Sequence, residues 1–139
     1  MSDGAARAFA LTAAQERLVG EVRELAREVL VPLVAGGRPG RVNRELVRAL
    51  GEHGLLGRLL PGDPDGSGPG ASAMELCLLR EALARESTEA ETALALQGLG
   101  GHPIAVAGSP GVRGRWVAEI AAGRAVAAFA LSEPEAGSD

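Results

Sequence analysis

The sequence is poor in several chemically informative residues. Lysine and tyrosine are absent, cysteine occurs once, histidine occurs twice, and the aromatic residues are limited to Phe9, Trp116 and Phe129. One cysteine cannot form an internal disulfide, and the few Cys and His residues have no zinc-ligand spacing, so a disulfide scaffold and a structural metal site are excluded. The core must therefore consist mainly of Leu, Val and Ala, a composition that suits helices.

Charge and hydropathy argue against two further classes. The 14 basic residues, all arginine, are outnumbered by 18 acidic ones, and the net charge of -4 comes without a basic stripe, which disfavours nucleic-acid binding. The longest uncharged stretch, Thr92 to Val112, contains five glycines and two prolines, unlike a membrane helix. No sustained apolar stretch precedes the polar residues 15–17, so we predict no targeting segment and a cytoplasmic location.

The overall composition favours one globular domain. The chain has 139 residues, of which 46% are hydrophobic and 23% charged, enough to bury a sizeable core and too apolar for wholesale disorder. The absence of lysine, together with abundant Ala and Gly, is typical of a GC-rich genome and carries no functional information.

The first helix signal lies close to the start of the chain. Thr12 and Gln15 form a capping box, in which each side chain hydrogen-bonds a backbone amide of the first helical turn. Apolar residues then recur every three or four positions from Leu18 to Leu33, with charged residues between them. This pattern predicts an amphipathic helix that ends near Gly36.

A second helix is predicted directly after the first. Asn43 can act as its N-cap, and Gly54 ends it. His53, just before that glycine, is expected at the carboxyl end of the helix, where the helix dipole favours a basic group. The two helices should form an αα-hairpin, with the apolar face of the second made of Leu46, Val47 and Leu50.

The middle of the chain predicts a loop and a third helix. Residues 61–70, PGDPDGSGPG, hold four glycines and three prolines, so we expect an exposed loop. Ser72 and Glu75 form a second capping box. Thr88 and Glu91 repeat this signal, so either the helix breaks near Ser87 or another helix starts there. The apolar side of the third helix should carry Leu76, Leu79, Leu83 and Cys77, the cysteine as a small core residue.

The last part of the chain predicts a helix followed by a strand. Ser109 and Pro110 are an N-cap and a first helical residue, and the helix ends at Gly123. Residues 124–132, RAVAAFALS, form a short apolar run that favours a buried strand. No partner strand is predicted upstream, and an isolated strand is not viable. Either another subunit completes it, or residues of the same fold are missing from the chain.

From Gly98 onward the sequence resembles the flavin-dependent acyl-CoA dehydrogenases. That family has a signature of roughly A-L-T-E-P-x-A-G-S-D, and residues 130–139 are ALSEPEAGSD. The preceding W-V-x-x-I-A-x-G, ending at Gly123, also matches, and a weaker resemblance reaches back to about Thr12. Two departures are visible: Ser132 replaces the usual Thr and keeps the hydroxyl, and residues 64–70 lack the aromatic and the glycine pair that the family often has there.

The resemblance implies a mainly α fold. Residues 1–123 would be the amino-terminal helical bundle domain, and residues 124–139 the first strand and flavin-signature loop of an otherwise absent β-domain, so that the chain ends in one orphan β-strand. The family continues with that β-domain and a helical bundle that usually carries the catalytic Glu. The chain would then be the amino-terminal part of an FAD-dependent enzyme for α,β-dehydrogenation of an acyl-CoA thioester, inactive alone. The implied partners are acyl-CoA, electron-transfer flavoprotein as acceptor, and further copies in a tetramer or dimer.

The resemblance also assigns site residues. Phe129 and Leu131 would line the flavin ring, and Ser132 would donate from its hydroxyl and backbone amide to the pyrimidine edge, where reduced flavin accumulates negative charge. Gly137 would let the backbone approach a phosphate, and Ser138 would donate to that phosphate or to the acyl-CoA chain. Neither a catalytic base nor a metal ligand is implied in this chain.

Plainer interpretations exist for several residues. Without the upstream match, residues 132–137 would be an acidic turn, and Glu133, Glu135 and Asp139 are expected to be loop and cap residues. His102, before Pro103, is expected in a turn. The alternative function is a non-catalytic helical interaction module, or a remnant that retains the fold. Both hypotheses predict the same helices and differ in whether flavin is bound.

Overall fold

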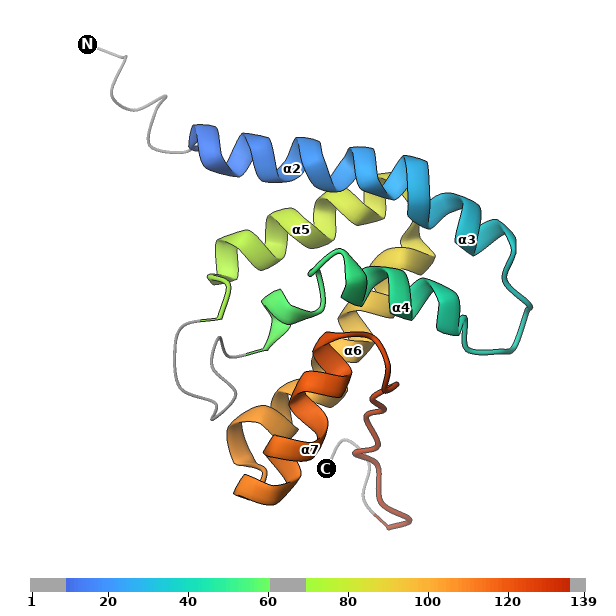
Figure 1. Cartoon of the computed structure of the whole chain (residues 1–139), viewed down its shortest axis with the longest axis vertical. Coiled ribbons are helices and arrows are strands. Elements are labelled where there is room, and N and C mark those ends of the chain that lie inside the picture. Colours follow the sequence, from blue (N-terminus) through green and yellow to red (C-terminus); the bar gives the residue numbers. More distant parts are fainter. Residues whose placement is uncertain (1–9, 61–69, 136–139) are drawn as a thin grey trace.

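The structure is mainly helical, as predicted. The computed structural model describes residues 10–60 and 70–135, and these ranges contain helices and loops but no sheet (Figure 1). The expected loop at 61–70 lies, except for Gly70, outside the described residues. The helical elements in chain order are α2 (Ala13–Leu25), the π-helix η1 (Ala26–Leu30), α3 (Val31–Ala35), α4 (Arg44–Glu52), the 3-10 helix η2 (Gly57–Leu59), α5 (Ala73–Glu86), α6 (Thr88–Ala107) and α7 (Pro110–Ala121).

The first predicted helix is confirmed, with a wide turn inside it. The capping box is formed: the Gln15 backbone amide donates to the Thr12 hydroxyl, and the Thr12 amide donates to the Gln15 side chain. At η1 the Val31 amide donates to the Ala26 carbonyl, five residues earlier instead of four. Pro32 follows and has no amide hydrogen with which to continue the ladder. The helical run then ends at Ala35, next to Gly36, as the sequence predicted.

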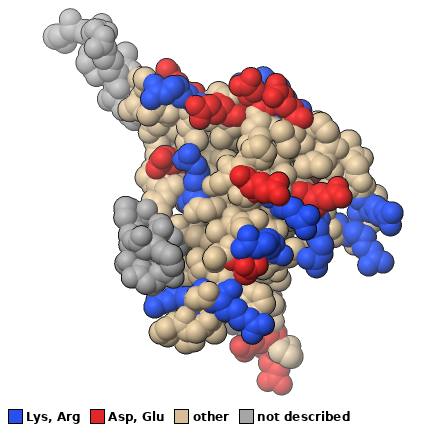
Figure 2. Space-filling view, viewed as in Figure 1, with Lys and Arg blue, Asp and Glu red and all other residues tan. Residues whose placement is uncertain are grey.

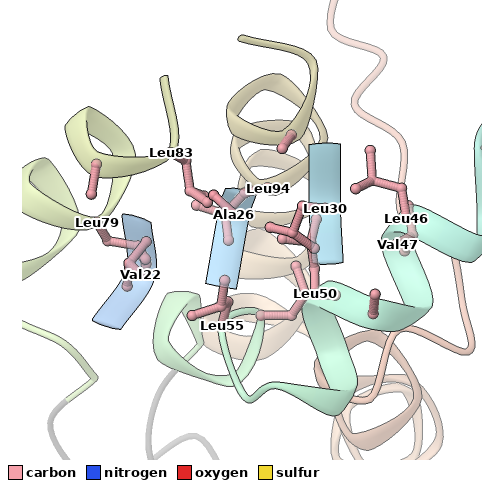
Figure 3. Close-up of a cluster of buried hydrophobic side chains, with 14 residues drawn as sticks. Val22, Ala26, Leu30, Leu46, Val47, Leu50, Leu55, Leu79, Leu83 and Leu94 are labelled. Atoms are coloured by element: carbon pink, nitrogen blue, oxygen red, sulfur yellow. The ribbon is translucent and has the colours of Figure 1, made fainter. Parts of the chain in front are cut away.

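A large hydrophobic core joins these elements. Fourteen buried side chains form one cluster, and Figure 3 shows α2, η1, α4, α5 and α6 contributing to it around Ala26, Leu30 and Leu50. The predicted apolar stripes of the first three helices point into this cluster, so the core positions are largely confirmed. Cys77 is an exception, because its side chain is exposed. The prediction for Cys77 was wrong because Leu78 takes the buried position on that turn of α5.

The predicted caps of the later helices are also present. Asn43 accepts a hydrogen bond from the Leu46 amide at the start of α4, and His53 is the C-cap residue of that helix. Ser72 and Glu75 form the second capping box, and hydrogen bonds from Ser72 lower the pKa of Glu75. The break between α5 and α6 falls at Ser87, whose hydroxyl accepts from the Ala90 amide.

His102 is not in a turn as predicted. It lies inside α6, which continues through Pro103 to Ala107. A proline inside a helix removes one backbone hydrogen bond. His102, Pro103 and Leu99 are all exposed, so water can satisfy the carbonyl that loses its donor. The glycines and Pro103 therefore do not interrupt this helix.

A cluster of charged side chains links the first helical run to α5. Arg27 and Arg23 both donate to the Glu86 carboxylate, at 2.7 to 2.8 Å. These hydrogen bonds, from Arg27 first and Arg23 second, hold the pKa of Glu86 at about 2, below its ordinary value. The Glu86 side chain is only 14% exposed, so this contact lies at the edge of the large core and fixes how α2 and η1 lie on α5.

A second, smaller cluster holds α7. Its buried members are Leu60, Ala105 and Ile120. The end of α7 also packs against α4 backbone to backbone: Gly123 has φ +69°, and a Cβ there would collide with the Val47 carbonyl oxygen. The predicted glycine stop is therefore confirmed, and it is also the point where α7 contacts α4.

The predicted buried strand is not formed. Residues 124–132 have no regular secondary structure, and Val126, Phe129 and Leu131 are 36%, 46% and 75% exposed. A strand needs a neighbouring strand to accept its backbone hydrogen bonds, and the described residues offer none. The division of the chain at residue 123 remains a prediction. No helix in the described ranges is both long and apolar enough to cross a membrane.

Candidate functional site

The three described site residues predicted from the sequence lie on the segment after α7. Phe129 lines a groove, whereas Leu131 and Ser132 are exposed beyond its end. Gly137 and Ser138 lie outside the described residues. Of the three described residues, only Phe129, which directly precedes the signature at residues 130–139, lines a cavity in the helical domain.

The groove has a volume of about 860 Å³ and three walls. One wall is the loop 37–43 with the start of α4, the second is the first half of α6, and the third is the segment 126–129. Most of the surface that lines the groove is apolar, although Thr88, Glu89, Thr92 and Gln97 contribute polar side chains from α6. The aliphatic residues that line it include Val34, Val42, Leu46, Val47, Ala93 and Leu96.

Asn43 shapes the first wall. Its Oδ1 accepts from the Leu46 amide at 3.0 Å, and its Nδ2 donates to the Leu33 carbonyl at 2.8 Å. One side chain therefore begins α4 and at the same time satisfies a carbonyl near the end of α3. This double contact fixes the loop that forms one side of the groove.

Charged groups lie only at the rim of the groove. Arg38 and Arg41 are exposed on the loop, and Glu89 is exposed on the first turn of α6. Figure 2 shows basic side chains gathered at the edge formed by the α3–α4 loop, while elsewhere on that face both signs are interspersed. A ligand with an apolar body and an anionic end matches this distribution.

Two contacts hold the third wall in place. At its start, Arg124 forms a two-pronged ion pair with Glu119, at 2.7 and 2.9 Å, which lowers the pKa of Glu119. Further along, the Ala127 amide donates to Oε1 of Gln97 at 2.9 Å. The sequence reasoning missed Gln97, although a glutamine in a long uncharged, mostly apolar stretch is a signal of a buried polar contact.

The groove contains little that could act as a general base. The titratable side chains that line it are Arg38, Arg41 and Glu89. In the described part of the chain, no three His, Cys, Asp or Glu residues come together as a metal site would require. The arrangement can bind an apolar chain beside Phe129, and the described residues place no proton acceptor deep inside.

Comparison with known proteins gives the family. The model of the acyl-CoA dehydrogenase amino-terminal domain matches residues 12–124, most of the chain. The chain belongs to the acyl-CoA dehydrogenase family. The match covers all helices described above, from the first N-cap to the residue after Gly123, so the resemblance inferred from residues 98–139 extends over the whole helical part.

Three relatives are longer proteins, and this acyl-CoA dehydrogenase domain matches only a part of each. It is 31% identical to cyclohexane-1-carbonyl-CoA dehydrogenase of Geobacter metallireducens, over 92% of this chain and 34% of that protein. It is 28% identical to the probable mitochondrial medium-chain specific acyl-CoA dehydrogenase 2 of Caenorhabditis briggsae (94% and 32%) and 27% identical to glutaryl-CoA dehydrogenase of Desulfococcus multivorans (94% and 34%). The chain spans about a third of the length of these curated relatives.

Proposed function

We propose that this chain is the amino-terminal part of an FAD-dependent acyl-CoA dehydrogenase, which carries out α,β-dehydrogenation of an acyl-CoA thioester. The observation that carries the proposal is the position of Phe129. It directly precedes the family signature at residues 130–139, and it lines an apolar groove between α4 and α6. The volume of about 860 Å³ lies within the range of small-molecule sites, roughly 300 to 1,000 Å³. The groove is therefore the place for the acyl chain.

The residues present fit one edge of a flavin. Phe129 and Leu131 offer exposed apolar surface, and Ser132 offers an exposed hydroxyl directly after them. Bound FAD would supply the acceptor for a hydride from the substrate β-carbon. In this proposal Phe129 and Leu131 line the ring, and Ser132 donates to its pyrimidine edge. Gly137 and Ser138 are proposed for the phosphate and, in the case of Ser138, for the substrate as well.

This chain does not supply the base for the α-proton. General-base catalysis requires an acceptor within hydrogen-bond reach of the proton, and the one carboxylate that lines the groove among the described residues, that of Glu89, is exposed at its rim. We therefore expect the purified chain to show no dehydrogenase activity with any acyl-CoA. We also expect it to be colourless, because it carries only part of the flavin site that the family resemblance implies. Stoichiometric yellow FAD, or reduction of added FAD by an acyl-CoA, would contradict these expectations.

Several finer statements belong to the same proposal. The electron acceptor is electron-transfer flavoprotein, and the complete protein is a tetramer or dimer. Exposed apolar side chains on α7 and on the segment after it support a need for further protein contacts. The cytoplasmic location remains a prediction from the sequence.

Binding of octanoyl-CoA tests the groove directly. We expect titration calorimetry to show binding of octanoyl-CoA that free CoA does not reproduce, because the apolar walls select the acyl chain. Leu96→Trp, which fills the groove, should abolish this binding. Leu99→Trp is the matched control, since Leu99 is similarly exposed on α6 but does not line the groove. Equal effects of the two variants would exclude the groove as the acyl site.

The alternative function makes a different genetic prediction. A non-catalytic helical interaction module, or a remnant, needs no flavin and no further domain. Translation of the genomic sequence after the Asp139 codon in all three frames distinguishes the hypotheses. A β-domain followed by a helical bundle containing Glu supports the dehydrogenase, and the lack of any such continuation supports the alternative.

A further inference from the structure

Gln97 is unusual among the buried residues of the described ranges. It is 3% exposed, and the other fully buried side chains there are hydrophobic. Its Oε1 accepts a hydrogen bond from the Ala127 amide, thirty residues further along the chain. Burial of a polar side chain is unfavourable unless its hydrogen bonds are made, so this contact is specific rather than incidental.

Gly100 lies one helical turn after Gln97, and it meets the same segment. A Cβ at position 100 would lie 2.9 Å from the Ala127 Cβ and 2.9 Å from the Ala128 amide nitrogen. Glycine is thus required for α6 and residues 127–128 to approach so closely. Two independent features of α6, a hydrogen-bond acceptor and a missing side chain, act on adjacent residues of the segment.

We propose that Gln97 and Gly100 form a positioning site, the Gln97–Gly100 anchor, that holds residues 126–129, which lead into the flavin signature, against the acyl groove. Ala127 is fixed to α6, and Phe129 follows only two residues later, so the anchor determines where Phe129 lies as a wall of the groove. The exposed Leu131 and Ser132 follow from the same fixed point. This inference rests on the proposed function, because it assigns the anchor the task of setting acyl chain and flavin at a defined spacing.

The contribution of the Gln97 hydrogen bond can be measured by leaving the Ala127 amide without its acceptor. Gln97→Leu keeps the side-chain size but removes the acceptor, so the half-buried Ala127 amide loses its hydrogen bond, which corresponds to about a tenfold or larger increase in local opening. Gln97→Glu keeps an oxygen in the same place and should restore the contact at an acid pH that protonates its carboxyl, because an ionised carboxylate is unfavourable at a site that is 3% exposed. Gly100→Ala tests the second feature, because the added Cβ forces the segment or the helix to shift.

Amide hydrogen exchange on the full 139-residue chain, followed by NMR, provides the test. In Gln97→Leu and Gly100→Ala we expect exchange of the Ala127 amide to accelerate about tenfold or more, with the amides of α5 unchanged and Gln97→Glu close to the wild type at that acid pH. Leu94→Ala is the control, because Leu94 is fully buried in the large core on the same helix. That variant should accelerate exchange throughout the core, with no larger effect on the Ala127 amide than on the core amides.

Octanoyl-CoA affinity gives a second measurement that separates positioning from folding. We expect Gln97→Leu to weaken binding and Gln97→Glu to restore it at the same acid pH, at unchanged helix content. If the wild-type chain binds no octanoyl-CoA, the proposed groove function fails, while the exchange experiment still decides the anchor. The anchor is overturned if Gln97→Leu leaves the Ala127 amide as protected as in the wild type, or accelerates exchange equally in all helices.

Discussion

The two hydrophobic clusters of this protein differ in size and in how they hold their elements. The large cluster buries fourteen side chains from α2 to α6, whereas the small one buries Leu60, Ala105 and Ile120 beneath α7. The large cluster joins helices by broad apolar faces. The region of α7 and residues 124–135 depends instead on a few defined contacts, namely Gly123 on α4, Arg124 on Glu119, and Ala127 on Gln97.

The difference indicates where stability and function reside. Val112 and Trp116 on α7 are 42% and 37% exposed, and Leu131 beyond it is 75% exposed. Regions with few buried apolar contacts open at lower free energy than the core does. The large cluster therefore provides a stable scaffold, and the residues proposed to contact flavin lie on the part that is held least strongly.

The largest expected effect is the change in self-association when the exposed segment after α7 is deleted. Val126, Phe129 and Leu131 present exposed apolar side chains on a segment that has no neighbouring strand in the described residues, so we expect the full chain to self-associate. Deletion of residues 124–139 should reduce light scattering while circular dichroism shows the helix content retained, because the helices pack mainly on one another. A monodisperse monomer of the full chain at tens of micromolar would contradict this.

Core truncations compare the clusters directly. Leu83→Ala, at a fully buried site of the large cluster, should lower the free energy of unfolding by about 2 to 5 kcal/mol. Ile120→Ala should cost less, near the lower end of that range at about 2 kcal/mol, because its small cluster can collapse around the space. Urea unfolding followed by circular dichroism measures both. Equal losses would contradict the proposed difference in packing between the two clusters.

Two glycines with the same backbone conformation test the contact between α7 and α4. Gly123 and Gly54 have φ +69° and +73°, but only Gly123 has backbone atoms where a Cβ would lie. Gly54→Ala should cost about 1 kcal/mol from backbone strain alone. Gly123→Ala should cost more, about 3 kcal/mol or above, because the collision adds to the strain. Thermal unfolding of the two variants would refute the contact if their Tm values were equal.

The smallest expected effect is the change in Tm when the charge of Glu86, at the edge of the large cluster, is removed. The pKa of Glu86 is lowered to about 2 in the folded protein, so its stabilising contribution is complete above the ordinary value of 4.5 and disappears as the pH falls through about 2. Glu86→Gln should therefore lower Tm at pH 7 and match the wild type near pH 2. Glu81→Gln, at an exposed pair with Arg85, is the control and should change Tm little.

Most of the helical boundaries could be predicted because their signals are local. Thr12 with Gln15 and Ser72 with Glu75 interact across three residues, and Gly36 and Gly54 follow the last helical turns. The apolar stripes also identified the core, since a helix that buries one face must repeat apolar residues at helical spacing. The family resemblance of residues 130–139 could be recognised from the order of the residues alone.

The remaining features depend on contacts between distant parts of the chain. Whether Cys77 or Leu78 is buried depends on the rotation of α5 against α2, and whether α6 continues through Pro103 depends on exposure of that turn. The predicted strand is absent because a strand requires a partner that the described residues do not provide.

The sequence by itself determined where most of the helices begin, where the first, second and last of them end, and which family the signature resembles, because each of these is encoded in neighbouring residues. Only the tertiary structure decided that residues 126–129 close an apolar groove. That arrangement arises from one hydrogen bond between Gln97 and Ala127 and one close approach at Gly100. Both join residues about thirty positions apart, and no local sequence pattern indicates which distant segments will be in contact.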